Sequence, residues 1–196
     1  LAVDVSNSML AQDFEPSRLE RTKFAIDRLT QQLEQDRIGL IVFAGDAYMQ
    51  LPITSDYVAA RSFAAQISPT MVSKQGTAIG AAIDLAASSF SSGSEGSRVI
   101  VVISDGENHE DDALAAAKAA AEKGIRIYTI GIGTPEGAPI SIDGEFIKDE
   151  QGDMVVSKLD EQMLEQIALT TGGAYIRATN RSLGLDEIVQ KINEVE

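Results

Sequence analysis

Residues 1–10 read L-A-V-D-V-S-N-S-M-L, an apolar run of strand length that is broken by Asp4 and followed by two serines at alternating positions. In an extended chain, residues 4, 6 and 8 lie on the same side. The side chains of Asp4, Ser6 and Ser8 can therefore converge on one point where the strand ends. Whether these three side chains form a functional site depends on which other residues lie near them.

Apolar runs alternate with helical patterns along the rest of the chain. Four Ile- and Val-rich runs are typical of strands covered on both faces, as in parallel sheets; they lie at residues 1–5, 37–44, 98–104 and 125–132. Shorter strands are predicted at 48–51 and 174–176. Ser17 and Glu20 form a capping-box pattern that predicts a helix after the first strand. Further helices are predicted at 56–67, 77–90, 111–123, 160–171 and 183–195. This alternation indicates an α/β fold of three layers, in which ligands bind at the carboxyl ends of the strands.

One segment departs from the alternation. Residues 139–157 carry turn signals at Asp143-Gly144 and at Gln151 to Asp153, between short β-type runs. They predict a small inserted β-hairpin, which either decorates the edge of the sheet or takes part in binding. No repeat or linker divides the chain, so we expect a single domain over residues 1–196.

The composition argues against several classes of function. Thirty acidic and 16 basic residues give a net charge of -14, which opposes binding to nucleic acid or to anionic lipid. The chain has no cysteine and one histidine, His109, which leaves no Cys-type or multi-histidine metal site. No segment reaches the ~20 apolar residues of a membrane-spanning helix. Because residue 1 is Leu and lies within a predicted strand, we expect the sequence to be a segment of a longer protein.

Two further segments bring oxygen-bearing side chains to the same edge of the predicted sheet. Asp105 ends the run R-V-I-V-V-I-S-D, and Thr77 lies in a glycine-bearing loop that opens a helix. Carboxylates and hydroxyls are hard ligands that suit Mg²⁺, Mn²⁺ or Ca²⁺. Taken singly, the serines and Thr77 also fit caps or turns, and Asp105 before Gly106 fits a turn. The joint placement of all three segments favours a metal site.

These residues resemble the pattern of a known family. D-V-S-N-S at 4–8, the Thr of Q-G-T at 75–77 and the Asp of S-D-G at 104–106 resemble the D-x-S-x-S…T…D pattern of von Willebrand factor A (vWA) domains. The metal-ion-dependent adhesion site of that family is called MIDAS. D-V-S-N-S-M-L, R-L-E-R-T-K and S-D-G-E-N-H-E-D are most similar to bacterial Bat-type (BatA and BatB) aerotolerance proteins. The resemblance implies a Rossmann-like vWA fold with a mostly parallel central sheet, one short antiparallel edge strand and helices on both faces.

The resemblance also implies roles for five residues. Ser6 and Ser8 would bind the metal directly, Asp4 directly or through water, Thr77 in the ligand-bound state, and Asp105 through water. Two carboxylates balance a divalent ion, which therefore keeps an affinity for an anionic ligand. We expect Mg²⁺, with Mn²⁺ or Ca²⁺ as alternatives, and a protein ligand whose Asp or Glu displaces a bound water.

Residues near these positions are candidates for a rim that contacts the partner: Asn7, Gly76, Glu107, Asn108 and His109. The acidic run at 107–112 has two readings. Asp111 and Asp112 either cap and support the following helix, or the loop shapes the choice of partner or holds a second ion. We do not expect His109 to be an essential residue, because no second imidazole can pair with it.

The function expected from these features is that of a metal-dependent protein-binding module, for adhesion or scaffolding, and not of an enzyme. The alternative is a Mg²⁺-dependent phosphotransferase or hydrolase on a similar fold, with Asp4 as nucleophile. It is disfavoured because Ser6 replaces the second acid of the D-x-D-x-T motif of such enzymes. The resemblance implies flanking transmembrane anchors in the bacterial inner membrane, with this domain outside the cytoplasm. It also permits a conformational switch of the last helix, 183–195.

Overall fold

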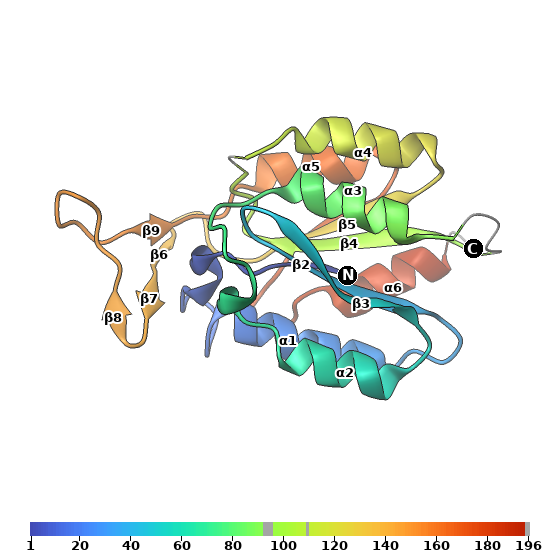
Figure 1. Ribbon diagram of the computed structural model, residues 1–196, viewed down its shortest axis with the longest axis horizontal. Coiled ribbons are helices and arrows are strands. Elements are labelled where there is room, and N and C mark those ends of the chain that lie inside the picture. Colours follow the sequence, from blue (N-terminus) through green and yellow to red (C-terminus); the bar gives the residue numbers. More distant parts are fainter. Residues whose placement is uncertain (92–95, 109, 195–196) are drawn as a thin grey trace.

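A six-stranded sheet forms the centre of the computed structural model, which describes residues 1–91, 96–108 and 110–194 (Figure 1). The strand order is β10-β5-β4-β1-β2-β3. All neighbouring pairs are parallel except β2 and β3, which are antiparallel. The strands are β1 (Ala2–Asp4), β2 (Ile38–Phe43), β3 (Ala47–Thr54), β4 (Val99–Ser104), β5 (Arg126–Gly131) and β10 (Tyr175–Arg177). The prediction of a mostly parallel α/β sheet is confirmed.

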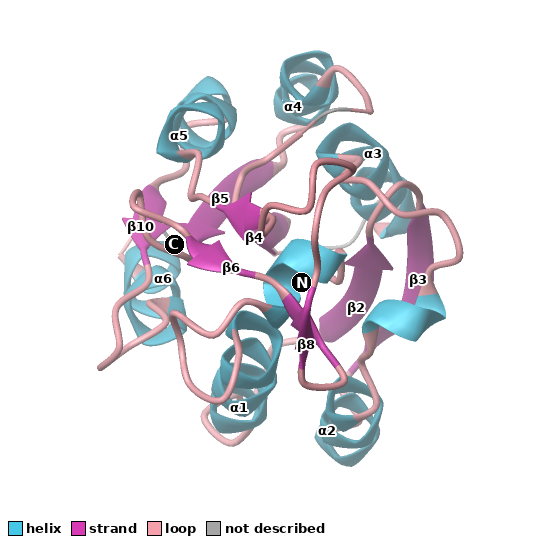
Figure 2. Cartoon of the chain, turned by 90° about the vertical axis from the view of Figure 1, so that its left-hand side faces the viewer, coloured by secondary structure: helices cyan, strands magenta, loops and turns pink. Residues whose placement is uncertain are grey.

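Helices cover both faces of this sheet, as Figure 2 shows. One face carries α1 (Arg18–Thr30), α2 (Tyr57–Ala65) and α6 (Leu185–Asn193), and the other carries α3 (Ile79–Ser89), α4 (Ala113–Glu122) and α5 (Glu161–Thr170). Two short 3₁₀ helices, η1 (Asn7–Leu10) and η2 (Pro69–Met71), lie in loops. Within the described residues, no helix combines the length and the apolar character needed to cross a membrane.

The two faces of the sheet carry separate apolar cores. Ala2 belongs to the core under α3, α4 and α5, whereas its neighbour Val3 belongs to the core under α1, α2 and α6. Successive strand residues point to opposite faces, so a strand covered on both sides is apolar at nearly every position. Each residue of β1 is fully buried. The three-residue β1 thus lies at the centre of the molecule, between β2 and β4.

The edge strand β3 is twice as long as the four residues predicted at 48–51. Of its eight residues only Leu51 is buried and the others are partly buried or exposed, so the strand carries a weak apolar signal. Pro52 lies within it, as an edge strand allows because one side of its backbone has no strand partner. The helix start at Ser17 is closer to the prediction. Ser17 Oγ accepts a 3.1 Å bond from the Glu20 N–H, while the Glu20 carboxylate pairs with Lys23 instead of completing a capping box.

The segment between β5 and α5 projects from the end of the sheet at which β1 leads into the dark blue η1 segment (Figure 1). It contains two short antiparallel ladders and an isolated antiparallel bridge between Lys148 and Met154. At its base, β6 (Ala138–Pro139) pairs with β9 (Val156–Ser157), and beyond it β7 (Ser141–Ile142) pairs with β8 (Glu145–Phe146). We call residues 134–159 the insertion. It starts from the edge where the candidate site residues lie.

Candidate metal centre

The strand register brings Asp4 and Asp105 to the same edge of the sheet. Val3 pairs with Ile103 across the parallel strands β1 and β4, so Asp4 and Ser104 end the two strands side by side. Ser104 Oγ donates a 2.7 Å hydrogen bond to Asp4 Oδ2, and Asp105 follows directly. Both carboxylates are fully buried. The two carboxylates lie at the same edge because the neighbouring parallel strands end together, as predicted from the sequence.

Ser6 and Ser8 lie beside Asp4, but not because the chain stays extended. The strand ends at Asp4, and η1 begins at Asn7. The Ser6 N–H turns back to donate to Asp4 Oδ1 at 2.9 Å, and the Oγ atoms of Ser6 and Ser8 lie 2.9 Å apart. The expectation of one extended side for positions 4, 6 and 8 is therefore wrong, because a 3₁₀ turn brings Ser8 back. The convergence of the two hydroxyls beside the carboxylate is present.

Thr77 does not cap the helix that follows it. The N-cap position of α3 is Ala78, which has no side chain able to cap. Ala78 N donates to Ala44 O at 2.6 Å, which holds this loop against the end of β2. Thr77 is 4% exposed, and no hydrogen bond within the described part of the chain uses its hydroxyl. The interpretation of Thr77 as a helix cap is therefore wrong. Its hydroxyl has no capping role at this edge of the sheet.

The first turn of α3 is instead capped from the loop after β4. Asp111 accepts hydrogen bonds from Gly80 N at 2.9 Å and from Ala81 N at 2.7 Å, while Asn108 Oδ1 accepts one from Ile79 N at 3.3 Å. Asp112 caps the following helix, α4, as predicted. The same prediction is wrong for Asp111, because its loop crosses the start of α3 before α4 begins.

The electrostatics of the two carboxylates oppose full ionisation. Burial, and then the nearby charge of Asp105, raise the pKa of Asp4 to about 7, although hydrogen bonds from Ser6 and Ser104 act to lower it. Burial also raises the pKa of Asp105, against the lowering effects of the Ser8 hydroxyl and of the Arg18 charge. Two buried carboxylates that repel each other create a place where a cation is stabilising.

The donor set at this edge fits a hard divalent cation. Among the described residues, there is no group of three or more His, Asp or Glu side chains that could hold a metal. An ion here would depend on the two carboxylates together with the hydroxyls of Ser6, Ser8 and Thr77. Oxygen donors of this kind suit Mg²⁺, Mn²⁺ or Ca²⁺.

The candidate rim residues lie in the loops around these donors. Asn7, Gly76, Glu107 and Asn108 are half-buried, and His109 lies outside the described residues. Gly76 has φ +121°, and a Cβ there would lie 2.6 Å from Glu110 Oε1. Glu110 also pairs with Lys74 Nζ at 3.0 Å. The loop after β4 and the loop before α3 are therefore joined at the rim.

A buried arginine that is not among the predicted site residues lies next to the site. Arg18, the first residue of α1, is fully buried and donates through Nη1 to Asp105 Oδ2 at 3.2 Å. A cation at the N-terminal end of a helix is unfavourable for the helix dipole. That unusual position, five residues after Asp13, is the signal that could have identified Arg18.

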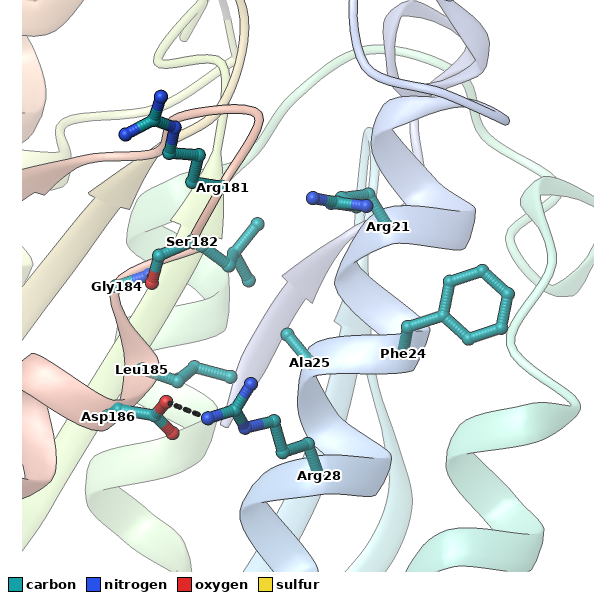
Figure 3. Close-up of a pocket in the computed structure, with 10 residues that line it drawn as sticks. Arg21, Phe24, Ala25, Arg28, Arg181, Ser182, Gly184, Leu185 and Asp186 are labelled. Atoms are coloured by element: carbon teal, nitrogen blue, oxygen red, sulfur yellow. Dashed lines mark hydrogen bonds and ion pairs between the residues drawn. The ribbon is translucent and has the colours of Figure 1, made fainter.

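A separate cavity of about 340 Å³ lies between α1 and the segment that leads into α6 (Figure 3). Arg21 and Arg28 line it from α1, and Arg181 lines it from the other side. Arg28 pairs with Asp186 at 3.1 Å, which neutralises part of this positive charge. None of the five candidate metal-binding residues lines this cavity, so it is distinct from the candidate metal centre.

The family model of the von Willebrand factor type A domain matches residues 1–191. The chain belongs to this family. The vWA domain is similar over 98% of its length to the crystal structure of an aerotolerance-related membrane protein from Bacteroides fragilis, with 52% identity, 96% of that chain covered and a TM-score of 0.93. It is also similar to BatB from Bacteroides thetaiotaomicron, with 50% identity, 98% of this chain and 97% of that chain covered and a TM-score of 0.92. The resemblance to Bat-type vWA domains is confirmed.

A more distant structure shows the same fold. Proximal thread matrix protein 1 from the mussel byssus, solved with a zinc-occupied MIDAS motif, is 16% identical, with 99% of this chain and 44% of that chain covered and a TM-score of 0.70. The vWA domain spans only 52% to 59% of the length of three curated bacterial relatives that it matches.

Proposed function

We propose that this vWA domain binds a partner protein through a divalent cation held at the edge of its sheet. Asp4, Ser6 and Ser8 would hold the ion, with Thr77 joining when a ligand is bound and Asp105 acting through water. The observation that carries the proposal is the meeting of two buried carboxylates with the paired hydroxyls of Ser6 and Ser8, whose Oγ atoms lie 2.9 Å apart.

The charge of the donor set would leave the bound ion able to accept an anionic ligand. The two carboxylates neutralise the charge of a divalent ion, and the hydroxyls add no charge. When bound, such an ion supplies a positive centre with a position that an anionic oxygen can take in place of water. The fitting ligand is an Asp or Glu side chain of another protein. Asn7, Gly76, Glu107, Asn108 and His109 are proposed as the rim that contacts the surface around it.

Mg²⁺, Mn²⁺ and Ca²⁺ suit this oxygen-only donor set better than a soft metal. The mussel protein of the same fold has zinc in its MIDAS motif, which supports a divalent ion at the equivalent position of this family. We propose Mg²⁺ for this domain because it ordinarily keeps several waters, one of which a partner carboxylate can replace.

We also propose that the domain belongs to a membrane-anchored protein. Support comes from the description of the Bacteroides fragilis relative as a membrane protein, and from the greater length of the curated relatives. The proposed arrangement has flanking anchors in the bacterial inner membrane and this domain on the outer side.

The test is capture of partner proteins from a membrane extract by the immobilised domain, in Mg²⁺ and in EDTA. We expect a captured protein to be released by EDTA and to be lost with Asp4→Ala. Asp84→Ala is the matched control, because it removes one carboxylate from an exposed position of α3. Capture that persists in EDTA, or with Asp4→Ala, would contradict the proposal.

The phosphotransferase or hydrolase alternative makes a different prediction. It requires Mg²⁺-dependent turnover of a phosphoester that disappears in Asp4→Asn. We expect none with a panel of generic phosphoesters. Such turnover would replace the binding-module proposal with the enzymatic one.

A further inference from the structure

A single buried side chain joins the candidate metal centre to the insertion. Arg18 Nη1 donates to Asp105 Oδ2 at 3.2 Å and to Ser157 Oγ at 2.8 Å, and it lies 3.4 Å from the carbonyl oxygen of Ser8. Its Nε and Nη2 atoms bind the two oxygens of Asp13 at 2.7 and 2.6 Å. The guanidinium therefore contacts the loop after β1, the end of β4 and the insertion at the same time.

The Asp13–Arg18 pair holds both chains of the insertion's base. On the chain leaving β5, Thr134 donates to Asp13 Oδ2 from its backbone N at 3.1 Å and from its hydroxyl at 3.3 Å. On the returning chain, the Ser157 carbonyl accepts from Arg18 Nη2 at 3.1 Å. Leu159 N then donates to Thr134 O at 3.1 Å, which closes the base. The insertion is thus fixed to Asp13 and Arg18, and Arg18 also bonds to Asp105 of the candidate metal centre.

The backbone of the insertion's entry packs directly on the guanidinium. A Cβ at Gly133 would lie 3.0 Å from Arg18 Cζ, and Gly133 has φ +135°, which favours glycine. A side chain at position 133 would therefore press on the guanidinium, so the entry to the insertion and Arg18 lie close together.

Arg18 and Ser157 also determine the orientation of the Asp105 carboxylate. Asp105 Oδ2 accepts two hydrogen bonds, from Arg18 at 3.2 Å and from Ser157 Oγ at 3.1 Å. Oδ1 accepts the longer bond of 3.3 Å from the Glu107 N–H. Rotation of the carboxylate would break the two bonds to Oδ2. Oδ1 is therefore the oxygen held toward the loop after β4.

We propose that Arg18 is a positioning residue for the metal centre. We also propose that the insertion, through Ser157, contributes to metal binding at that centre. The position of Ser157 sets the orientation of Asp105, and hence the affinity for the divalent ion. This inference rests on the proposed metal binding and adds to it a dependence on a segment that supplies no direct ligand. Bonds to groups that orient metal ligands commonly determine metal affinity in this way.

The experiment measures the Mn²⁺ dissociation constant of the domain, by electron paramagnetic resonance of free Mn²⁺, for wild type and for Ser157→Ala. Ser157→Ala removes one hydroxyl and leaves the charges and the Ser157 carbonyl bond in place. We expect affinity about 10-fold weaker. Ser141→Ala is the matched control, because Ser141 lies in the same insertion at β7, outside the Arg18 contacts, and should bind Mn²⁺ as wild type does.

A double-mutant cycle separates positioning from a purely structural role. If Ser157 acts through Asp105, the effect of Ser157→Ala on Mn²⁺ affinity should disappear in an Asp105→Asn background. Ser157→Ala that lowers the melting temperature but leaves Mn²⁺ affinity unchanged would overturn the inference. The same holds if Ser157→Ala weakens binding equally in both backgrounds.

The cycle also distinguishes this inference from the proposed function. Absence of Mn²⁺ binding by the wild type, or undiminished binding by Asp4→Ala, would refute the metal site and the inference together. Binding that is lost in Asp4→Ala and unchanged in Ser157→Ala would leave the metal site standing and refute only the role of the insertion.

Discussion

The Asp4 carboxylate accepts hydrogen bonds from the protein and is fully buried from solvent. Ser6 N and Ser104 Oγ each donate to one of its oxygens, at 2.9 and 2.7 Å. These two neutral donors do not replace the lost hydration, so burial and the Asp105 charge still raise the pKa of Asp4 to about 7. At neutral pH a proton and a divalent ion therefore compete for this residue.

The first prediction concerns the stability of the metal-free domain. The pKa of Asp4 is raised above its ordinary value of 3.8, so its protonation stabilises the folded state fully below that pH, and this stabilisation is lost as the pH rises through about 7. In EDTA, the free energy of unfolding should fall by about 2 to 3 kcal/mol more for wild type than for Asp4→Asn between about pH 5 and about pH 8. Urea unfolding followed by circular dichroism measures this difference. Parallel pH profiles for the two proteins would contradict it.

At the scale of elements, a single loop at the edge of the sheet caps the first turns of two helices. The loop after β4 caps α3 through Asp111 and α4 through Asp112. Because α3 begins two residues after Thr77, the bonds from Asp111 also hold the loop that carries Thr77. One loop thus connects two of the segments that bear the candidate metal-binding residues.

The two caps provide a matched pair of variants. Asp111→Ala and Asp112→Ala each remove one carboxylate that accepts helix N–H groups, so each should lower the free energy of unfolding by about 1 kcal/mol. Only Asp111→Ala should also weaken Mg²⁺-dependent capture of the partner protein, because only this change releases the start of α3 beside Thr77, which is proposed to join the ion when a ligand is bound. Chemical unfolding and partner capture in Mg²⁺ by both variants test this. Equal capture by the two variants would show that capping of α3 does not position Thr77.

Elements whose signals are local in the chain could be predicted from the sequence. The Ser17 cap lies three residues from its partner, and the apolar runs of the strands are continuous. The roles of Asp111 and Arg18 could not be predicted, because their partners are distant: Asp111 caps a helix about 30 residues earlier, and Arg18 bonds to Asp105 and Ser157 across 87 and 139 positions. The D-x-S-x-S motif located the three N-terminal candidates, although a 3₁₀ turn and not an extended chain brings Ser8 to them.

At the scale of the whole molecule, the charge of -14 bears on both steps of the proposed function. A strongly negative domain attracts divalent cations and repels an acidic partner over distances of about a Debye length, ~8 Å at physiological ionic strength. Without a cation, an approaching carboxylate would meet two buried carboxylates at the sheet edge. The bound ion would balance the charge of these two carboxylates and offer the approaching carboxylate a coordination position. Under the proposed function, recognition of an acidic residue by this domain would therefore depend on the ion.

The last prediction uses thermal unfolding to separate specific metal binding from general screening of this charge. A ligand that binds only the native state at about 100 times its dissociation constant stabilises it by about 2.7 kcal/mol, which for a domain of this size raises the melting temperature by about 5 to 10 °C. We expect this rise with Mg²⁺ for wild type, and no rise for Asp4→Ala. NaCl at matched ionic strength is the necessary control, since any salt reduces the self-repulsion of a domain with charge -14. If NaCl reproduces the effect of Mg²⁺, or if Asp4→Ala responds as wild type does, the stabilisation is screening and the sheet edge does not bind the ion.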